Sequence, residues 1–473
     1  MSRKKLSEKC GIVGIYHPSY SVASSTFFSL FSLQHRGQES AGIASSDEKN
    51  FFIYKNTGLI NQVFDDKIIG DLRGNIAIGH TRYSTTGRNN LDNTQPFKAS
   101  GQNGEIFLGH NGNIINSEDL IDLLSSWGIS SFDTTSDSEL LTLLYANAPG
   151  RSWSERSEFV MSKTKGAYSL VILTQNSLIA VRDPLGIRPL VLGKYREGYV
   201  IASETCALDH IGASFIREID PGETLEIKNN KLNSSSIRRK SNKVALCSFE
   251  HIYLSRPDSI LDGKLTYSVR MKMGETLAIE HPVAADLVIG IPDSAIASAE
   301  GYANKSKIPF VQGIVKNRYV GRTFISPDQK LRDLGVKIKF NTLNSIIKDK
   351  KVVIVDDSIV RGTTTPEVIR MIKDAGALEV HMRVASPPVI STCHFGVDTG
   401  SSYELIAANR RIFEIKRLIG ADSLEYLSID GLKESIDYQE NYCIGCFTKE
   451  YPIPVQMEMD KLKLESMQKR ENA

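Results

Sequence analysis

The stretch Val353–Thr365, with the sequence VIVDDSIVRGTTT, decides the fold of the second half of the chain. The β-branched run Val352–Val355 is typical of a parallel strand that is buried on both faces. Asp356 and Asp357 follow it directly, and two adjacent carboxylates are costly to bury unless something binds them. Pro366, which suits the first turn of a helix, comes after the Gly/Thr-rich turn. The stretch therefore predicts a buried strand, a polar loop and a helix.

The loop between this strand and this helix has the composition of an anion site. Gly362 permits a close approach of ligand to backbone, and Thr363, Thr364 and Thr365 place hydroxyls and free N–H groups at a helix start. Such a helix start attracts phosphate. The residues alone indicate an anion site next to a pair of acids that face hydroxyls or a metal ion. The alternative is a solvated loop between a strand and a helix.

The same loop resembles the phosphoribosyl pyrophosphate signature of the type I phosphoribosyltransferases. The resemblance implies that Asp356 and Asp357 bind the ribose hydroxyls and Mg²⁺. It also implies that a run of five residues wraps the 5′-phosphate, namely Arg361, Gly362, Thr363, Thr364 and Thr365.

The composition fits a chain of two or three globular domains, with 473 residues of which 41% are hydrophobic. Its 57 Lys and Arg against 55 Asp and Glu leave a net charge of +2, so bulk charge favours neither nucleic acid nor an anionic membrane as a partner. No apolar run approaches the roughly 18 residues of a membrane helix. The basic lead Met1–Lys9 lacks the apolar core of a secretory signal. We therefore expect a cytoplasmic protein.

The first half begins with Cys10, at the start of an apolar strand over residues 12–15. Taken alone, a cysteine in this place is usually a small core residue. Polar turns follow three further apolar segments, which are 27–33, 75–78 and 105–108. The last two turns, Gly79–Thr85 and Gly109–Asn113, follow predicted strands, and a helix is predicted over 140–145.

These polar segments carry the residue types that a binding site for an α-amino acid needs. Arg82 is a cation for the carboxylate, and Asp137 is an anion for the ammonium group. Asn111 and Gly112 offer amide donors for an oxyanion. The spacing alone leaves open whether these residues converge.

The block from Cys10 to about Ile227 resembles the class II glutamine amidotransferase domain, an N-terminal-nucleophile hydrolase whose fold stacks antiparallel sheets between helices. Further motifs that carry the resemblance are 182–190, 202–204 and 220–223. It implies that the Cys10 thiol attacks the side-chain amide of glutamine, while its freed α-amino group, of reference pKa about 7.7–8.0, carries the proton. Arg82 would bind the carboxylate of glutamine and Asp137 its ammonium group. Asn111 and Gly112 would form the oxyanion hole.

Because Cys10 is internal in the sequence, this mechanism requires that the preceding residues be removed. We therefore predict that residues 1–9 are a propeptide, and the alternative is a frayed terminus. The glutaminase domain is expected over residues 10–235. It ends in the polar, Ser/Asn-rich stretch 229–240, which is predicted to be a linker or an exposed edge hairpin.

The second half alternates strands with helices. Strands are predicted over 285–291, 309–312, 351–355 and 378–385. This alternation predicts a parallel, doubly wound sheet flanked by helices, with ligands at the carboxyl ends of the strands. We expect this phosphoribosyltransferase domain over residues 245–454, followed by a charged tail over 455–473. The expected fold class is thus a two-domain chain of mixed α/β and α+β type.

Two further segments lie at the ligand end of the predicted sheet. The loop after its first strand contains Ser294 and resembles the pyrophosphate loop of the phosphoribosyltransferases, which implies a magnesium contact. Its alternative is an ordinary helix cap. The segment Lys316–Phe324 is cationic with a glycine hinge, and its Lys316 and Arg322 suit a lid over an anionic substrate. The alternative is a solvated basic loop.

The six cysteines are more often catalytic, metal-binding or inert than disulfide-bonded in a cytoplasmic chain of this length. Cys443 and Cys446 form a C-x-x-C knuckle, whereas Cys247 and Cys393 are single. Four thiolates suit zinc or an iron–sulfur cluster, and a redox C-x-x-C is a further alternative. Their context resembles the iron–sulfur branch of the glutamine amidophosphoribosyltransferases, which implies a 4Fe–4S cluster on all four. Cys206 remains as a core thiol.

The resemblance to this family covers the chain from Cys10 to about Pro454. It implies that glutamine, phosphoribosyl pyrophosphate and water are converted to 5-phosphoribosylamine, glutamate and pyrophosphate, the first committed step of purine synthesis, with internal transfer of ammonia. It also implies a homo-oligomer, a dimer or a tetramer, that purine nucleotides inhibit. One rival is a glucosamine-phosphate or asparagine synthase, which would need another second domain. The other is a non-enzymatic sensor of phosphoribosyl pyrophosphate, which would need no Cys10.

Overall fold

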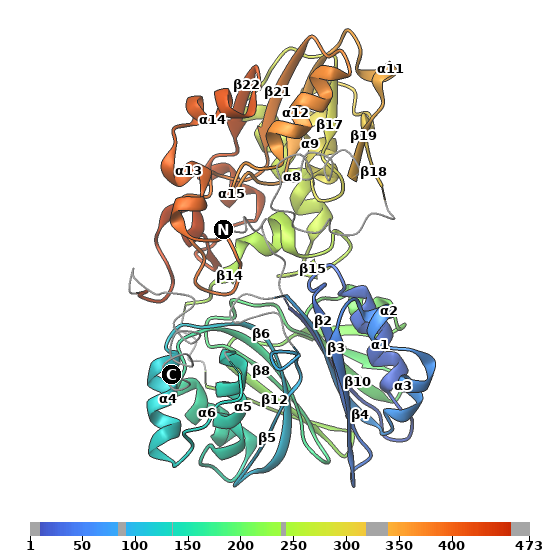
Figure 1. The fold of residues 1–473 in the computed structure, drawn as a ribbon, viewed down its shortest axis with the longest axis vertical. Helices are drawn as coiled ribbons and strands as arrows, with labels where there is room; N and C mark the ends of the chain where they lie inside the picture. The colour runs from blue at the N-terminus through green and yellow to red at the C-terminus, as the bar shows by residue number, and fades with distance from the viewer. Residues whose placement is uncertain (1–9, 84–90, 135, 238–242, 318–338, 456–473) are drawn as a thin grey trace.

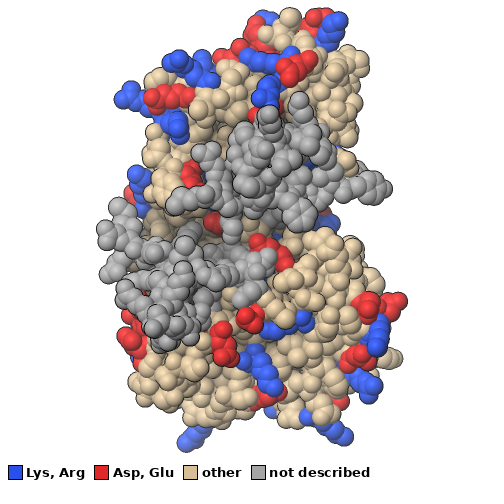
Figure 2. Space-filling view, viewed as in Figure 1, with Lys and Arg blue, Asp and Glu red and all other residues tan. Residues whose placement is uncertain are grey.

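A computed structural model describes residues 10–83, 91–134, 136–237, 243–317 and 339–455. The chain has a first half of antiparallel sheets and a second half built on a parallel sheet (Figure 1). Among the helices in these ranges, none is both long and apolar enough to span a membrane. Acidic and basic side chains are interspersed over the face seen in Figure 2, in keeping with the net charge of +2.

The first half stacks two antiparallel sheets face to face. One sheet has the strand order β11-β9-β10-β1-β4-β2-β3, with β1 Gly11–Tyr16, β2 Ser40–Ser46, β3 Phe51–Thr57, β4 Ile76–Arg82, β9 Val191–Tyr195, β10 Gly198–Ala202 and β11 Ser214–Glu218. The other has the order β13-β12-β8-β7-β6-β5, with β5 Phe97–Gly101, β6 Gly104–Ile114, β7 Gly166–Leu173, β8 Leu178–Arg182, β12 Glu223–Lys228 and β13 Lys231–Ser236.

Alternating side chains of each strand serve two apolar layers. In β1, Ile12 packs between the two sheets, whereas Val13 and Ile15 pack under the helices on the outer face. The helices on that face are α1 Ala23–Ser32, α2 Ile60–Val63, α3 Asp66–Asp71 and α7 Cys206–Asp209. The other sheet is covered by α4 Ser117–Ser126, α5 Asp137–Asn147 and α6 Trp153–Lys163. The prediction of antiparallel sheets between helices is confirmed.

Two strands of the first half extend further than predicted. The residues expected in polar turns after positions 78 and 108 instead continue β4 to Arg82 and β6 to Ile114. Strand β4 is hydrogen-bonded to a neighbour on each side, so its backbone is satisfied throughout. Gly79 lies under helix α1, where a Cβ would be 2.5 Å from Leu30 Cδ1. The glycine is thus a packing residue rather than a turn signal, and tertiary contacts override its low strand propensity.

The polar stretch after position 228 forms an edge hairpin. Strands β12 and β13 pair through the two-residue turn Asn229-Asn230, where φ is +49° and +56°. Asparagine tolerates this left-handed conformation, which the favoured two-residue hairpin turn requires. Residues 238–240 of the predicted stretch lie outside the described ranges.

The second half contains a parallel sheet of order β17-β20-β21-β22, with β17 Leu287–Gly290, β20 Lys351–Asp356, β21 Glu379–Val384 and β22 Ser423–Tyr426. One face packs on α12 Thr365–Asp374 and α14 Ile412–Ile419, and the other on α8 Thr266–Glu280 and α9 Ile296–Ser306. The doubly wound sheet is therefore confirmed. The strand predicted over 309–312 is wrong, since Phe310 makes a single parallel bridge to Val288.

A buried ion network joins the two halves. Glu250 of the second half accepts hydrogen bonds from Arg36 Nη2 at 3.0 Å and Arg188 Nη1 at 2.9 Å, both in the first half. Arg36 also binds Glu204 at 2.5 Å, so two cations face two anions. These side chains are at most 2% exposed. Apolar residues of both halves, including Ile115 and Ile187, form one continuous core around this junction.

Glu250→Ala should destabilise the protein by about 3–5 kcal/mol, because two guanidinium groups would remain buried without their shared carboxylate. Urea unfolding followed by fluorescence measures this loss. The control is Glu434→Ala, which removes the partner of Lys272 from a pair that is 43% and 63% exposed. It should leave the unfolding midpoint nearly unchanged. Equal midpoints for both variants would contradict a structural role for Glu250.

Candidate functional site

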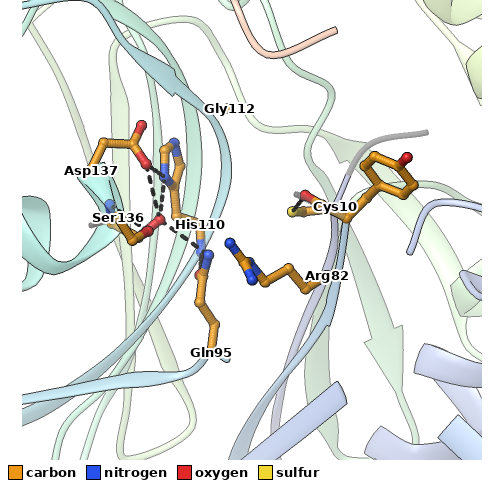
Figure 3. Close-up of a pocket in the computed structure, with 9 residues that line it drawn as sticks. Cys10, Arg82, Gln95, His110, Gly112, Ser136 and Asp137 are labelled. Carbon is orange, nitrogen blue, oxygen red and sulfur yellow. Dashed lines mark hydrogen bonds and ion pairs between the residues drawn. The ribbon is translucent and has the colours of Figure 1, made fainter. Parts of the chain in front are cut away.

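A pocket in the first half is lined by residues from both stacked sheets and from α5. It contains Cys10, Arg82, Gly112 and Asp137, which were predicted, together with Tyr83, Gln95, His110, Ser136 and Ser138. Figure 3 shows Cys10 and Arg82 on one side of the pocket and Asp137, Ser136 and His110 on the opposite side. The structure therefore brings together a thiol, a cation and an anion that are far apart in sequence.

Cys10 precedes β1 and is 9% exposed. Its thiol donates a hydrogen bond to the Tyr83 carbonyl at 3.5 Å. Burial raises the pKa of the thiol to about 11, although the Tyr83 contact and the charge of Arg82 lower it. The thiol is thus protonated at neutral pH, and a nucleophilic role requires a base that accepts its proton.

Asp137 is held at the start of helix α5. Ser136 caps this helix by accepting a hydrogen bond from Ser138 N at 3.3 Å, which makes Asp137 the first helical residue. The Asp137 carboxylate accepts a hydrogen bond from Ile114 N at 2.8 Å, and His110 Nδ1 lies 4.0 Å from it. A buried carboxylate fixed in this way is placed to bind an ammonium group.

Asn111 and Gly112 lie on β6, in register with Ser169 and Tyr168 of β7. The Asn111 side chain is fully buried, and neither its nitrogen nor its oxygen has a hydrogen-bond partner within the described part of the chain. A buried amide without a partner costs free energy unless a ligand satisfies it. A Cβ on Gly112 would be 1.9 Å from the Ala167 carbonyl oxygen, so this position admits glycine alone.

The predicted acids of the second half lie at the carboxyl end of β20. Asp357 is buried and accepts hydrogen bonds from Ser294 Oγ and, at 2.6 Å, from Ser358 Oγ. Burial raises the pKa of the Asp357 carboxyl, although the two hydroxyls and Arg270 lower it. Asp356 lies beside Asp357 and accepts a hydrogen bond from its backbone N–H at 2.9 Å. Ser294 and both acids therefore meet at one end of the sheet.

The predicted phosphate loop leads into helix α12, whose N-cap is Thr364 and whose first turn contains a proline. In the described structure Thr364 makes no side-chain capping bond, so the helix start presents backbone N–H groups. The Arg361 guanidinium lies 4.0 Å from Asp398 and 3.8 Å from Glu404. Lys316 forms an ion pair with Asp293. Arg322, the other predicted lid cation, lies outside the described ranges.

The structure brings the four predicted cluster cysteines to the junction of the halves. Cys247 in β14 Leu246–Cys247 pairs in parallel register with Cys443 in β23 Tyr442–Cys443. Backbone N–H groups of Ile390 and Ser391 donate to the Cys446 carbonyl, both at 3.0 Å, which places the segment before Cys393 alongside. Burial raises the pKa of the Cys247 thiol to about 11, and the nearby Cys393 thiol adds to the rise.

Burial and the Cys247 and Cys393 thiols raise the pKa of Cys443. Burial and the Cys443, Cys247 and Cys393 thiols raise the pKa of Cys446. All six cysteines are free thiols. Within the described ranges, no three His, Cys, Asp or Glu side chains are arranged to hold a metal ion. Cys206 is buried in the core of the first half, as expected.

Comparison with known proteins matches each half of the chain to a known domain. Residues 80–210 match the glutamine amidotransferase domain, and residues 275–386 match the phosphoribosyl transferase domain. The amidophosphoribosyltransferase of Synechocystis is 45% identical over 474 aligned residues, covering 98% of this chain and 95% of the relative. The chain belongs to the amidophosphoribosyltransferase family.

Other members of the family agree in sequence and in structure. The amidophosphoribosyltransferase of Archaeoglobus fulgidus is 46% identical over 94% of this chain and 98% of its own. A solved glutamine phosphoribosylpyrophosphate amidotransferase from B. subtilis, complexed with ADP and GMP, superposes with a TM-score of 0.88 at 42% identity, covering 95% of this chain and 99% of its own. The amidophosphoribosyltransferases carry out the first step of purine biosynthesis.

Sequence reasoning missed several pocket residues of this amidophosphoribosyltransferase. Tyr83 and His110 stand next to predicted site residues, so proximity within the motifs was an available signal. No signal in the sequence pointed to Gln95, because it comes from the segment before β5. It reaches the pocket through hydrogen bonds with His110 N at 2.7 Å and Ser138 Oγ at 3.1 Å. The Glu250 network was also missed, since its members are spread over both halves.

In the chain that retains residues 1–9, Cys10 should react with iodoacetamide about tenfold faster for each pH unit from 7 to 9, because its pKa of about 11 lies above this range. Peptide mass spectrometry measures the rate. Arg82→Met should slow the reaction at each pH, since it removes a cation that favours the thiolate. The unfolded chain is the control, in which the rate should reach half its maximum near pH 8.5 and flatten above it. A plateau at that pH in the folded protein would contradict the raised pKa.

Proposed function

We propose that this chain converts glutamine, phosphoribosyl pyrophosphate and water to 5-phosphoribosylamine, glutamate and pyrophosphate through two sites. The observation that carries the proposal is the convergence of Cys10, Arg82 and Asp137 on one pocket. The same chain presents Asp356 and Asp357 at a strand end next to an open helix start. A synthase for another acceptor would not need this second site, and a sensor would not need the first.

In the first site, the Arg82 cation binds the α-carboxylate of glutamine and Asp137 binds its ammonium group. This orients the side-chain amide toward Cys10. The Cys10 sulfur attacks the amide carbon, and the oxygen of the tetrahedral intermediate is stabilised by Asn111 and the Gly112 backbone. The Asn111 side chain, which has no hydrogen-bond partner among the described residues, supports this role, because its Nδ2 would donate a hydrogen bond to the oxyanion. Ammonia leaves, and water releases glutamate.

The proton of the thiol needs an acceptor, since burial keeps Cys10 protonated. A free α-amino group on Cys10 would have a pKa near 7.7–8.0, suitable for this transfer. We therefore propose that residues 1–9 are a propeptide whose removal creates the base. The glutaminase domain then comprises residues 10–235, the phosphoribosyltransferase domain residues 245–454, and the tail residues 455–473.

In the second site, Asp356 and Asp357 bind the ribose hydroxyls, and the loop Arg361–Thr365 binds the 5′-phosphate at the start of α12. The pyrophosphate group lies toward Ser294 and Lys316, with Arg322 of the basic segment as a second cation. Ser294, Asp356 and Asp357 would hold Mg²⁺, which offsets the charge of the leaving pyrophosphate. The raised pKa of Asp357 supports this assignment, because a buried carboxylate gains most from a bound cation.

Ammonia passes internally from Cys10 to C1 of the ribose. The second site then mainly positions its reactants and stabilises charge. The tight junction of the two halves around Glu250 supports internal transfer, since buried contacts fix one half against the other.

The four thiols of Cys247, Cys393, Cys443 and Cys446 would hold a 4Fe–4S cluster. Their fit rests on convergence at one buried place, where neighbouring thiols of the set raise the pKa values of Cys247, Cys443 and Cys446. Buried thiols that repel one another's ionisation are stabilised as thiolates by a cationic iron centre. The cluster would act structurally by joining β14, β23 and the Cys393 loop.

Three further properties belong to the proposal. The B. subtilis structure with ADP and GMP supports inhibition of this enzyme by purine nucleotides. We propose a homo-oligomer, a dimer or a tetramer, as the resemblance to the family implies. We also propose a cytoplasmic location, and six cysteines without a disulfide among them fit a reducing compartment.

The two sites should be separable by a crossed experiment. Cys10→Ala should abolish glutamine-dependent synthesis but leave synthesis from added ammonia, because the second site needs only the nitrogen nucleophile. Asp357→Asn should lower synthesis from either nitrogen source by about 10²–10³, the cost of losing one electrostatic group. Phosphoribosylamine formation and glutamate release are measured in parallel. Loss of both activities in Cys10→Ala, or normal use of ammonia by Asp357→Asn, would contradict the assignment.

Maturation should depend on the cluster cysteines. Intact-mass measurement on anaerobically prepared protein should show a chain that begins at Cys10, with iron and acid-labile sulfide present. Cys443→Ser should lose iron and keep residues 1–9, because an incomplete ligand set leaves its loop without an anchor. Cys206→Ala is the control, since this buried thiol lies outside the cluster. An uncut wild type that hydrolyses glutamine at full rate would exclude the N-terminal-nucleophile mechanism, and an iron-replete, cut Cys443→Ser would exclude the cluster.

A further inference from the structure

A loop of the second half, His394–Gly396, packs directly on the oxyanion strand of the first half. Asn113 Nδ2 donates a hydrogen bond to the His394 carbonyl at 2.9 Å. Gly396 has φ of +98°, and a Cβ there would lie 2.9 Å from both the carbonyl carbon and the carbonyl oxygen of Gly112. A side chain at position 396 would therefore collide with the Gly112 carbonyl group.

A second side chain of the first half also binds this loop. Arg188 donates from Nε and Nη2 to the Phe395 carbonyl, at 3.1 and 2.8 Å. Arg188 is fully buried and is itself fixed by Glu250 at 2.9 Å. Two different side chains of the first half thus bind the successive carbonyls of His394 and Phe395.

The ends of the segment are anchored within the second half. Upstream, Cys393 N donates to Thr399 Oγ1 at 2.9 Å, which closes the loop on itself. Downstream, Ile406 N donates to the Val360 carbonyl at 2.9 Å, next to the predicted phosphate loop. Backbone segments outside helices and strands usually run over the surface, whereas Phe395–Gly400 is buried throughout. A buried and doubly anchored loop is suited to hold a neighbouring group in place.

We propose that Gly396 and Asn113 are positioning residues for glutamine hydrolysis, through which the second half holds the Gly112 peptide in the geometry of the oxyanion hole. The proposal rests on the proposed role of Gly112. Neither residue is among those that line the pocket, whereas Gly112 is, so both act through Gly112. The glutaminase site would then be incomplete without the loop of the other half.

The reason lies in the accuracy that an oxyanion hole demands. Its donors must lie about 2.7–3.1 Å from the developing oxyanion, and a misplacement of about 1 Å costs roughly 10²-fold in rate. Gly112 cannot retreat into its own sheet, because the Ala167 carbonyl oxygen lies immediately on that side. A methyl group on Gly396 would therefore displace the Gly112 peptide or push the loop away from it.

The test compares Gly396→Ala with Gly420→Ala in the full-length enzyme. Gly420 has φ of +76°, and a Cβ there meets no heavy atom of the described structure within 4 Å. Both variants carry the strain of a left-handed alanine, and Gly396→Ala alone adds a collision with Gly112. Asn113→Ala removes the bond to His394 without adding bulk, so it tests the same contact where Gly396→Ala fails to fold.

Gly396→Ala should lower kcat with glutamine at least about tenfold, toward the 10²-fold cost of a 1 Å misplacement. KM for glutamine and synthesis from ammonia should stay near the wild-type values, because Arg82, Asp137 and the second site are unaffected. Asn113→Ala should show the same pattern more weakly. Gly420→Ala should behave as wild type in each assay.

A glutamine analogue with a diazomethyl ketone in place of the amide distinguishes a misplaced oxyanion hole from a less reactive Cys10 thiol. The Cys10 sulfur bonds to its terminal carbon as dinitrogen leaves, and the thiol proton passes to that carbon, while the ketone oxygen occupies the oxyanion hole. Its maximal inactivation rate should fall in step with kcat, with no change in its half-saturating concentration. Iodoacetamide, which needs no oxyanion hole, should label Cys10 at the wild-type rate.

The expected pattern is therefore a loss of kcat and of analogue inactivation, with KM, ammonia use and iodoacetamide labelling unchanged. Unchanged kcat in both Gly396→Ala and Asn113→Ala would overturn the proposal. A parallel fall in ammonia use or in iodoacetamide labelling would also overturn it, since that pattern indicates general loss of structure. Failure of the glutaminase assignment itself would appear separately, as full glutamine use by Cys10→Ala.

Discussion

The structure depends on one buried carboxylate, Glu250, shared by Arg36 and Arg188. Removing charges from water is costly, and the cost is offset here because each charge has a partner at hydrogen-bond distance. The partners belong to different halves, so the halves can separate only by leaving these charges unpaired. Arg36 Nε also donates to the Cys10 carbonyl at 3.4 Å, which connects the junction to the proposed nucleophile.

Burial disfavours the charged form of the thiols and the carboxyl group that it encloses, but this has different consequences at different sites. It suppresses ionisation of the Cys10 thiol, so the glutaminase chemistry needs a base that the uncut chain does not provide at Cys10. The same effect at Asp357 and at the cluster thiols favours binding of cations that stabilise the charged forms. Desolvation thus underlies three of the proposed features, namely removal of residues 1–9, Mg²⁺ at the second site and iron at the four cysteines.

The junction places the proposed cluster, the oxyanion strand and the phosphate loop along one segment. Cys393 begins it, Gly396 lies on Gly112, and Ile406 bonds to the loop before Arg361. A single chain segment therefore runs between the two proposed sites, with a short 3₁₀ helix, Ser402–Glu404, within it. In the proposed role of Gly396, the second half contributes to glutamine chemistry as well as to its own site.

Local residue order determined the strand–acid–loop–helix unit at 352–374, because β-branched residues, Pro366 and the threonines act over a few positions. Residue types also indicated Arg82 and Asp137, the alternation of strands and helices indicated the parallel sheet of the second half, and the resemblance to a family indicated Cys10. Tertiary structure alone decided that β4 and β6 run through their glycines, that Gln95 enters the pocket, and that Glu250 meets Arg36 and Arg188. The reason is that these features arise from contacts between segments far apart in the chain, where packing and desolvation outweigh local propensity.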